Sequence, residues 1–432
     1  MPESFTGVPK GASDAVKSGE PVRVSRVLTL YLVVFAGFVG YSLMIAIFTP
    51  MLLRTDGGML PRSDSVAQRT IALGVLLALY PLAQFLAAPV IGGLSDRFGR
   101  KPTLLVSLAA STACYGLIAA AVQARTFGLL ILACFMAGLA EANIAIAQSG
   151  VADVAPAQQR TRLFGYVYLS ASLAYVVGPL AGGKLADPHL VSWFDYATPF
   201  WAVMLLLAAI LVFTAVVFRE TSVRSPSGSV RWTRSFTSLL EAVRPGRLRR
   251  RYLTNFVLYL AIFGFFRVYP MYLINRFHMS VSRESLFVAW VAVPIVAANL
   301  GIVSWLARRL SPRQIAARAA VLLGVAMATI VLPATQTALW ITLGVTALAL
   351  AICLPAAAAI ISQAVPPQEQ GGALGSNQSL QVGAEAIAGL AGGLLAAIAT
   401  ALPLEVMAAL ALTAAALLWG QPSPSARPRE SR

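Results

Sequence analysis

The chain is built from long apolar stretches separated by short polar ones. Each stretch is about 20 residues long, and a helix of that length crosses about 30 Å of hydrocarbon. Twelve such stretches are predicted as transmembrane helices, over residues 27–52, 70–92, 102–123, 127–150, 163–185, 197–218, 253–275, 286–306, 315–336, 338–362, 373–397 and 402–420. The pattern predicts an all-α polytopic membrane protein. Composition agrees, since 58% of the residues are hydrophobic and only 12% are charged.

The positive charges are placed unevenly along a chain whose net charge is +16. Lys10, Lys17, Arg23 and Arg26 precede the first span, which by the positive-inside rule puts the N-terminus in the cytoplasm. Twelve spans then put the C-terminus there as well. This placement explains the basic charge without a nucleic-acid partner. Residues 1–26 hold no apolar run, so we expect no cleavable signal peptide.

The chain divides in the middle. Residues 219–252 form the longest polar stretch and are rich in arginine, which predicts a cytoplasmic linker. An internal repeat supports two halves, because shifting the fifth span onto the eleventh lays Gly165 on Gly375 and Gly182 on Gly392. The predicted parts are a tail at 1–26, a six-helix half at 27–218, the linker, a second six-helix half at 253–420 and a tail at 421–432.

A dense cluster of charge lies between the second and third spans. Its two glycines are expected to let the backbone pass closely, and its acidic residue to accept bonds from N–H groups at a helix start. Its basic residues are expected to reach carboxylates on neighbouring helices and to latch the halves at the cytoplasmic face. The residues concerned are Gly92, Asp96, Arg97, Gly99, Arg100 and Lys101. Basic residues alone would indicate only an ordinary cytoplasmic turn.

The full pattern over residues 92–101, G-x-L-x-D-R-x-G-R-K, resembles the signature loop of the major facilitator superfamily. The similarity is strong over 70–185 and loose after 250, and it points to bacterial tetracycline efflux antiporters. It implies the major facilitator fold, with twelve helices in two pseudo-symmetric six-helix halves, and a location in the bacterial inner membrane.

The resemblance also implies a role for Asp153, as the carboxylate at the inner end of the fourth helix that pairs with the signature loop. We therefore predict a network of Asp96, Arg97 and Asp153 that forms in the outward-open state and breaks in the inward-open state. A degraded second copy of the loop keeps Leu306, Arg309 and Arg313.

The fifth span carries a second motif, similar to the antiporter motif of drug exporters. It consists of Gly165, Gly178, Pro179, Gly182 and Gly183, with Ala174 at a position where the exporters have glycine. The proline removes one helical hydrogen bond, and the small face permits close packing against a helix of the other half. Small faces also serve plain helix packing, but within the resemblance the motif favours export.

Ionisable residues inside spans are costly and are usually functional. Glu141 and Glu385 lie near span centres, and both are candidates for carrying a proton. Arg267 is the intramembrane cation, which could bind an anionic substrate group or stabilise a carboxylate, or could instead reach the interface with its long stem. Neutral side chains that could line the same cavity or merely join helices are Gln84, Asn143, Gln148, Asn377, Gln378 and Gln381.

Three positions depart from the tetracycline antiporters. Phe38, Cys134 and Ala328 stand where the inferred alignment has an acidic residue, an arginine and an aspartate. Tetracycline is therefore an unexpected substrate, and the proton route of that family does not transfer. All three cysteines lie within spans, at Cys114, Cys134 and Cys353. We interpret them as small apolar packing residues, since their spacing is not that of metal ligands.

These features predict a secondary active transporter, a proton-coupled exporter of a small amphipathic drug or metabolite, acting as a monomer. The alternative is an importer that couples a small organic, possibly anionic, metabolite to protons on the same fold. A membrane enzyme is disfavoured, because His189 and His278 both lie in outer loops, away from any acidic cluster. No phosphate-binding glycine loop is present, so the proton gradient is the expected energy source and no cofactor or metal is expected.

Overall fold

The computed structural model describes residues 24–54, 59–141, 143–154, 160–220, 248–332, 335–365 and 370–420, and these are helical apart from turns and short connections. The first half holds α2 (Val24–Leu53), α3 (Val66–Phe98), α4 (Arg100–Gln123), α5 (Phe127–Ala140), α6 (Asn143–Val154), α7 (Arg160–Leu185) and α8 (Thr198–Val217). The second holds α10 (Arg249–Phe277), α11 (Val281–Ala297), a π-helical turn (Ala298–Ile302), α12 (Val303–Ala307), α13 (Pro312–Thr329), α14 (Leu339–Ser362), α15 (Gln370–Ile398) and α16 (Leu402–Trp419).

Every predicted span coincides with one of these helices or with a consecutive pair. Nine helices among the described residues are long and apolar enough to cross a membrane. The other predicted spans correspond to α5 with α6, to α7 and to α13. The all-α polytopic fold is therefore confirmed.

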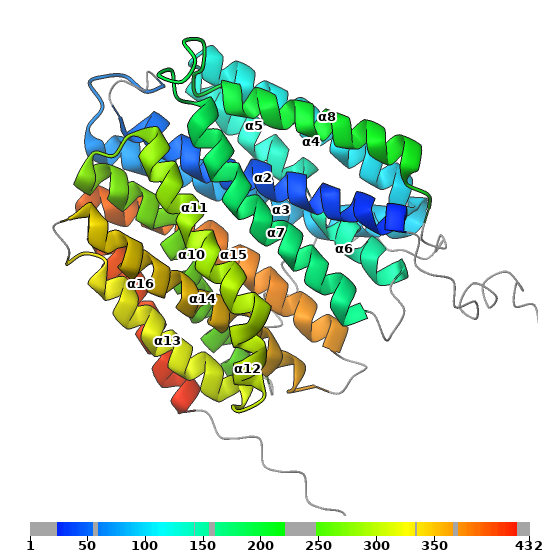
Figure 1. Ribbon diagram of the computed structural model, residues 1–432, viewed down its shortest axis with the longest axis vertical. Coiled ribbons are helices and arrows are strands. Elements are labelled where there is room, and N and C mark those ends of the chain that lie inside the picture. The colour runs from blue at the N-terminus through cyan, green and yellow to red at the C-terminus, as the bar shows by residue number, and fades with distance from the viewer. Residues whose placement is uncertain are drawn as a thin grey trace, which may run out of the picture.

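The helices form two groups that lie side by side, α2 to α8 and α10 to α16 (Figure 1). The groups repeat the same internal contacts. In the first, Tyr31 of α2 donates a hydrogen bond to the carbonyl of Leu163 in α7, at 3.0 Å. In the second, Tyr252 of α10 donates to the carbonyl of Ala373 in α15, at 3.1 Å. Helix α4 packs on α8 as α13 packs on α16. These matched pairs confirm the two pseudo-symmetric halves.

The molecule has two ends that differ in how the halves meet. We call the end with the start of α2 and the end of α16 the terminal face, and the other end the opposite face. The halves meet through α3 with α15 and α7 with α11. A Cβ added at Gly74 of α3 would lie 2.7 Å from the Cα of Gly393, and one added at Gly183 of α7 would lie 2.5 Å from the Cβ of Ser285. Both contacts lie toward the opposite face, where the backbones come too close for larger residues.

The predicted loop at 92–101 is almost entirely helical. Helix α3 continues to Phe98 and α4 begins at Arg100, so that Gly99 alone makes the turn, with φ at 104°. This positive φ explains the glycine, since other residues are strained there. A Cβ added at Gly92 would meet no atom of the described residues within 4 Å, so the close backbone passage predicted at Gly92 is not seen among them.

The eighth predicted span began too late. The predicted span 286–306 left Arg283 and Glu284 outside it, but Ser280 caps the helix by accepting a hydrogen bond from the N–H of Arg283 at 3.4 Å, and α11 begins at Val281. Glu284 therefore lies inside the helix. The predicted linker at 219–252 falls mostly on residues 221–247, outside the described residues, and α10 begins within it at Arg249.

Candidate functional site

A buried ion pair lies between α10 and α15. The Nη2 atom of Arg267 is 3.1 Å from Oε1 of Glu385, and the two side chains are 2% and 13% exposed. The low exposure of Arg267 excludes the alternative in which it reaches the membrane interface. A buried charge is tolerated when it is paired and hydrogen-bonded, so each of these residues depends on the other. Of the two predicted roles for Arg267, stabilising a carboxylate is the one that the contacts show.

Tyr41 connects this pair to the other half of the molecule. It lies in α2, donates a hydrogen bond to the carboxylate of Glu385 and accepts one from Nη2 of Arg267. The guanidinium also lies over the Tyr41 ring, 5.1 Å from its centre. One tyrosine of the first half thus contacts both charges of the second, and we call Tyr41, Arg267 and Glu385 the central triad. No motif predicted the role of Tyr41, since it is an ordinary aromatic residue in an apolar run.

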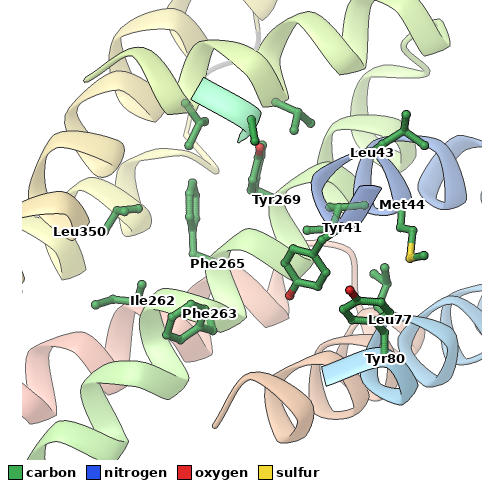
Figure 2. Close-up of a cluster of buried hydrophobic side chains, with 14 of the residues drawn as sticks. Tyr41, Leu43, Met44, Leu77, Tyr80, Ile262, Phe263, Phe265, Tyr269 and Leu350 are labelled. Atoms are coloured by element: carbon green, nitrogen blue, oxygen red, sulfur yellow. The ribbon is translucent and has the colours of Figure 1, made fainter. Parts of the chain in front are cut away.

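Aromatic side chains surround the central triad. Figure 2 shows Tyr41 beside Tyr80 of α3, and their ring centres are 5.2 Å apart. The ring of Tyr175 in α7 meets that of Tyr41 edge-on at 6.3 Å and lies 6.2 Å from that of Phe266 in α10. Tyr175 and Phe266 also line a small pocket between the halves. Such a setting suits the apolar body of an amphipathic molecule.

Two buried donors near the triad are unsatisfied within the described part of the chain. These are Nε of Arg267 and the hydroxyl of Tyr80. Buried polar groups normally have partners, so each such group calls for an explanation. A polar group of a bound compound would supply one.

Glu141 lies apart from the triad, in the first half. It follows α5, where the predicted fourth span is interrupted, and its side chain is fully buried. Its Oε2 accepts a hydrogen bond from Tyr115 of α4 at 3.3 Å, while Oε1 has no partner among the described residues. The break also frees the carbonyl of Ala140, which accepts a hydrogen bond from Ser107. A buried carboxyl without a cation favours its neutral form.

The predicted neutral cavity residues differ in what they contact. Asn377 accepts a hydrogen bond from Asn255 and donates one to Tyr259, at 2.9 and 2.7 Å. These bonds join α10 to α15 within the second half, so Asn377 holds helices together. Gln84 and Gln381 are partly exposed on α3 and α15, and the side chain of Asn143 lies outside the described residues.

The charged residues at the end of α3 pair differently from the prediction. Asp153 of α6 accepts a hydrogen bond from Nε of Arg100 at 2.9 Å, whereas Arg97 is exposed and lies over the Phe98 ring. In this structure Arg100 therefore makes the contact with Asp153 that was predicted for Arg97. The reason is helical geometry, since Arg100 begins the new helix beyond the Gly99 turn and points back to α6. The side chain of Asp96 lies outside the described residues.

The side chains of Glu220 and Lys101 make further hydrogen bonds at the junction of α3 and α4. Glu220, just after α8, accepts hydrogen bonds from the backbone N–H groups of Arg100 and Lys101 at 2.8 and 3.1 Å. The Lys101 side chain donates to the carbonyl of Ala215 at 2.8 Å. A carboxylate at the N-terminus of a helix is favourable. The sequence analysis did not identify Glu220, although its position as an acidic residue directly after the sixth span could have indicated this role.

The glycines of the fifth-span motif face two different helices. A Cβ at Gly178 would lie 2.8 Å from the carbonyl oxygen of Val39, and one at Gly182 would lie 3.1 Å from Leu43, both in α2 of the same half. Only Gly183 of these three packs on the other half, through Ser285. The prediction that the whole small face packs across the halves is corrected accordingly. Pro179 lies inside α7, and the surroundings of Gly165 are outside the described residues.

A comparison with protein families decides the classification. The model of the Major Facilitator Superfamily matches residues 30–351. The chain belongs to the major facilitator superfamily. This member is 37% identical over 203 residues to the tetracycline resistance protein, class C, of Escherichia coli, a match that covers 46% of this chain and 48% of that protein. The match thus spans about half the length of that relative.

Solved structures of the superfamily share the fold. The human organic anion transporter MFSD10 superposes with a TM-score of 0.69 at 20% identity, over 92% of this chain and 99% of that one. A D-xylose-proton symporter superposes with a TM-score of 0.71 at 14% identity, over 91% and 97%. At these identities the likeness establishes the architecture alone. The protein is therefore a multi-pass membrane protein of a transporter superfamily.

Proposed function

We propose that this protein is a proton-coupled exporter of a small amphipathic drug or metabolite. Its relation to a tetracycline resistance protein supports the direction of transport. The fifth-span motif, with Gly178 and Gly182 packed closely on α2, supports it as well. The terminal face is then the cytoplasmic one in a bacterial inner membrane, as the basic N-terminal segment favours. We propose that the protein works as a monomer.

The observation that carries the mechanism is the central triad. Arg267 and Glu385 neutralise one another, and Tyr41 of the other half contacts both. If Glu385 takes up a proton, Arg267 loses its counter-charge, and a buried unpaired cation is strongly unfavourable. A polar or anionic group of the substrate can then take the place of the carboxylate. Proton and substrate would thus compete through one arginine, which is the requirement for exchange.

Glu141 supplies a second candidate for proton binding. It is buried in the first half without a cation among its contacts in the described part of the chain, and it adjoins the break between α5 and α6. Its protonation state would alter the hydration of that break. In alternating access, proton binding favours one orientation of the halves and substrate binding favours the other.

Transport into inside-out vesicles tests this function. A thermal-shift screen of drugs and metabolites first identifies a ligand, and its uptake is then followed with an imposed proton gradient. We expect Arg267→Ala and Glu385→Gln each to lower uptake by about tenfold or more, which corresponds to about 1.4 kcal/mol or more. The matched control is Arg318→Ala, which removes an exposed arginine from α13 and is expected to leave uptake near the wild-type rate.

Two outcomes would overturn the proposal. Uptake that continues after the gradient is collapsed would exclude proton coupling. Proton-driven accumulation in right-side-out vesicles would instead identify an importer that carries substrate and proton together, for which the Arg267 cation would favour an anionic metabolite.

A further inference from the structure

Glu284 is a buried carboxyl group that the proposed exchange does not use. It lies in the first turn of α11, at the opposite face, and its side chain is fully buried. Its Oε2 accepts a hydrogen bond from Ser285 at 3.4 Å. Its Oε1 has no hydrogen-bond partner among the described residues. An acidic group in such a position calls for a reason, because burial of an unpaired carboxylate is expensive.

The contact between the halves closes over this part of α11. Gly183 of α7 meets Ser285 so closely that a Cβ would lie 2.5 Å from that of the serine. Next to it, Ser282 donates a hydrogen bond to the carboxylate of Asp187, just beyond α7, at 2.5 Å. We call the contact of Gly183 and Asp187 with Ser282 and Ser285 the opposite-face gate. Oγ of Ser285 lies 2.6 Å from the Cβ position of Gly183 and also donates the hydrogen bond to Oε2 of Glu284, so opening this gate would bring water toward the Glu284 carboxyl group.

No counter-charge for Glu284 is found among the described residues. Titratable or charged side chains on the elements that pack against α11, or on α11 itself near this end, are Tyr41, Tyr175, Lys184, Asp187, Arg267, Tyr269, Tyr272, Arg276, His278, Arg283 and Cys353. Within the described ranges, no basic member of this set forms an ion pair with Glu284. Lys184 and Arg283 are exposed, and Arg276 lies over the Phe277 ring.

A helix N-terminus weakly favours an ionised acid, and that effect falls off within the first turn. The cost of burying an unpaired charge is larger. The closed gate therefore favours the neutral acid, and an open, hydrated gate favours the carboxylate.

We propose that Glu284 is the proton-binding group of the opposite-face gate, which holds a proton while α7 and α11 are in contact and releases it to water when they separate. The proton comes from water on the opposite face and forms an O–H bond on the carboxylate. It leaves by the same route when the gate opens. Closing this face thus takes up one proton, whatever the substrate is.

Asp187, the other acidic group of the gate, responds to pH with the opposite sign. The Ser282 hydroxyl and the backbone N–H of His189 hold the pKa of Asp187 below its ordinary value. Its contribution to closure is therefore present above that ordinary pKa and is lost as the pH falls through the lowered one. Acidification weakens the Asp187 contact, whereas it strengthens closure through Glu284. Closure on acidification would therefore come from Glu284 and not from Asp187.

Distance measurements between spin labels test the proposal without any substrate. Labels at Leu190→Cys and Leu332→Cys place one exposed probe on each half at the opposite face, in a background with the half-buried Cys114 replaced by serine. In the wild type we expect the distance to lengthen between about pH 5 and about pH 9, as the carboxyl group of Glu284 ionises, because the pKa values of buried carboxyl groups can reach this range. Glu284→Gln, which mimics the neutral acid, should keep the short distance throughout. Glu405→Gln is the matched control, an exposed acid in the first turn of α16 at the same face, and should follow the wild type.

A distance in Glu284→Gln that still lengthens as in the wild type would overturn the proposal, as would a wild-type distance that does not change with pH. If the glutamine variant fails to fold, Glu284→Asp replaces it. That variant keeps a titratable group in a displaced position, so its midpoint should differ from that of the wild type, and an unchanged midpoint contradicts the gate role. Loss of vesicle uptake with the pH-dependent distance intact would reject the proposed export and leave this gate standing.

Discussion

The two halves of the molecule join consecutive helices at the terminal face in different ways. In the second half, α12 leads into α13 through a capped turn. Ser311 accepts a hydrogen bond from the N–H of Gln314, and the Gln314 side chain accepts one from the N–H of Ser311. Arg313 donates to the carbonyls of Leu418 and Trp419 at the end of α16. All of these acceptors are neutral.

In the first half, the junction of α3 and α4 relies on charge. Gly99 makes the turn with a positive φ. As the N-cap residue of α4 it has no side chain that could accept a hydrogen bond, and the carboxylate of Glu220 accepts one from the N–H of Arg100 instead. Arg100 pairs with Asp153 of α6. Only Lys101 keeps a contact like that of Arg313, because it donates to the Ala215 carbonyl near the end of α8.

This difference indicates that the two junctions respond differently to hydration and to nearby charges. Neutral caps and carbonyl contacts depend little on hydration or on the approach of other charges, so the second junction is suited to holding α13 on α16. An ion pair that is partly exposed responds to both. The first junction is therefore the one whose contacts can change as the halves move, and substitutions at matched positions should separate the two roles.

The largest expected effect follows from breaking the Arg100–Asp153 pair. Asp153→Asn keeps the size of the side chain and removes its charge, so that Arg100, whose side chain is 11% exposed, loses its counter-charge. We expect transport in vesicles to fall by about tenfold or more, which corresponds to about 1.4 kcal/mol or more. Membrane yield and the melting temperature, measured in parallel, allow transport to be compared per folded molecule, because the loss of this pair also lowers stability.

The matched substitution in the second half is Arg313→Gln. It removes a charge that donates to the carbonyl groups of Leu418 and Trp419, so we expect a lower melting temperature and nearly unchanged transport per folded molecule. Equal losses of transport in the two variants would mean that both junctions switch. Full transport by Asp153→Asn would exclude a switching role for the pair.

The sequence predicted the junction of α3 and α4 in part. The motif over 92–101 predicted that Asp153 pairs with a basic residue of this junction, and the structure shows it paired with Arg100. It did not reveal that Arg100, one turn beyond Arg97, makes the contact, because the turn consists of Gly99 alone and reorients everything after it. Glu220 belongs to a different helix end, and only the packing of α8 on α4 brings it there.

At the central triad, too, the sequence predicted charged residues but not their contacts. Burial in a predicted span was enough to single out Arg267 and Glu385, since charges inside a membrane are rare. Their pairing depends on how α10 packs on α15, and Tyr41 joins them from a helix far away in sequence. Glu284 lay just outside the predicted span 286–306. Its position in α11 follows from the Ser280 cap, a local signal that a hydropathy pattern does not weigh.

A smaller effect is expected from changing the turn residues themselves. Gly99→Ala puts a side chain at a φ of 104° and brings its Cβ within 2.4 Å of Glu220 Oε2. We expect a loss of about 1–3 kcal/mol of folding free energy, the usual cost of such a backbone conformation in a residue other than glycine. Ser311→Ala at the second junction removes an N-cap and should cost about 1 kcal/mol. Thermal unfolding in a fixed detergent compares them, and a Gly99→Ala variant as stable as the wild type would show that the turn readjusts freely.

The smallest expected effect is a difference between the two junctions in how their contribution to stability depends on salt. Glu220→Gln keeps one of the two oxygens that accept from the N–H groups of Arg100 and Lys101 and removes the charge, whose loss is expected to cost about 0.3–1 kcal/mol at a helix N-terminus. Because that charge is exposed, the loss should shrink as ionic strength rises. Gln314→Ala at the second junction removes a neutral acceptor, so its loss should be the same at low and high salt. Melting temperatures of both variants over a salt series measure this, and parallel salt dependences would mean that Glu220 acts only through hydrogen bonding and that charge does not set the first junction apart.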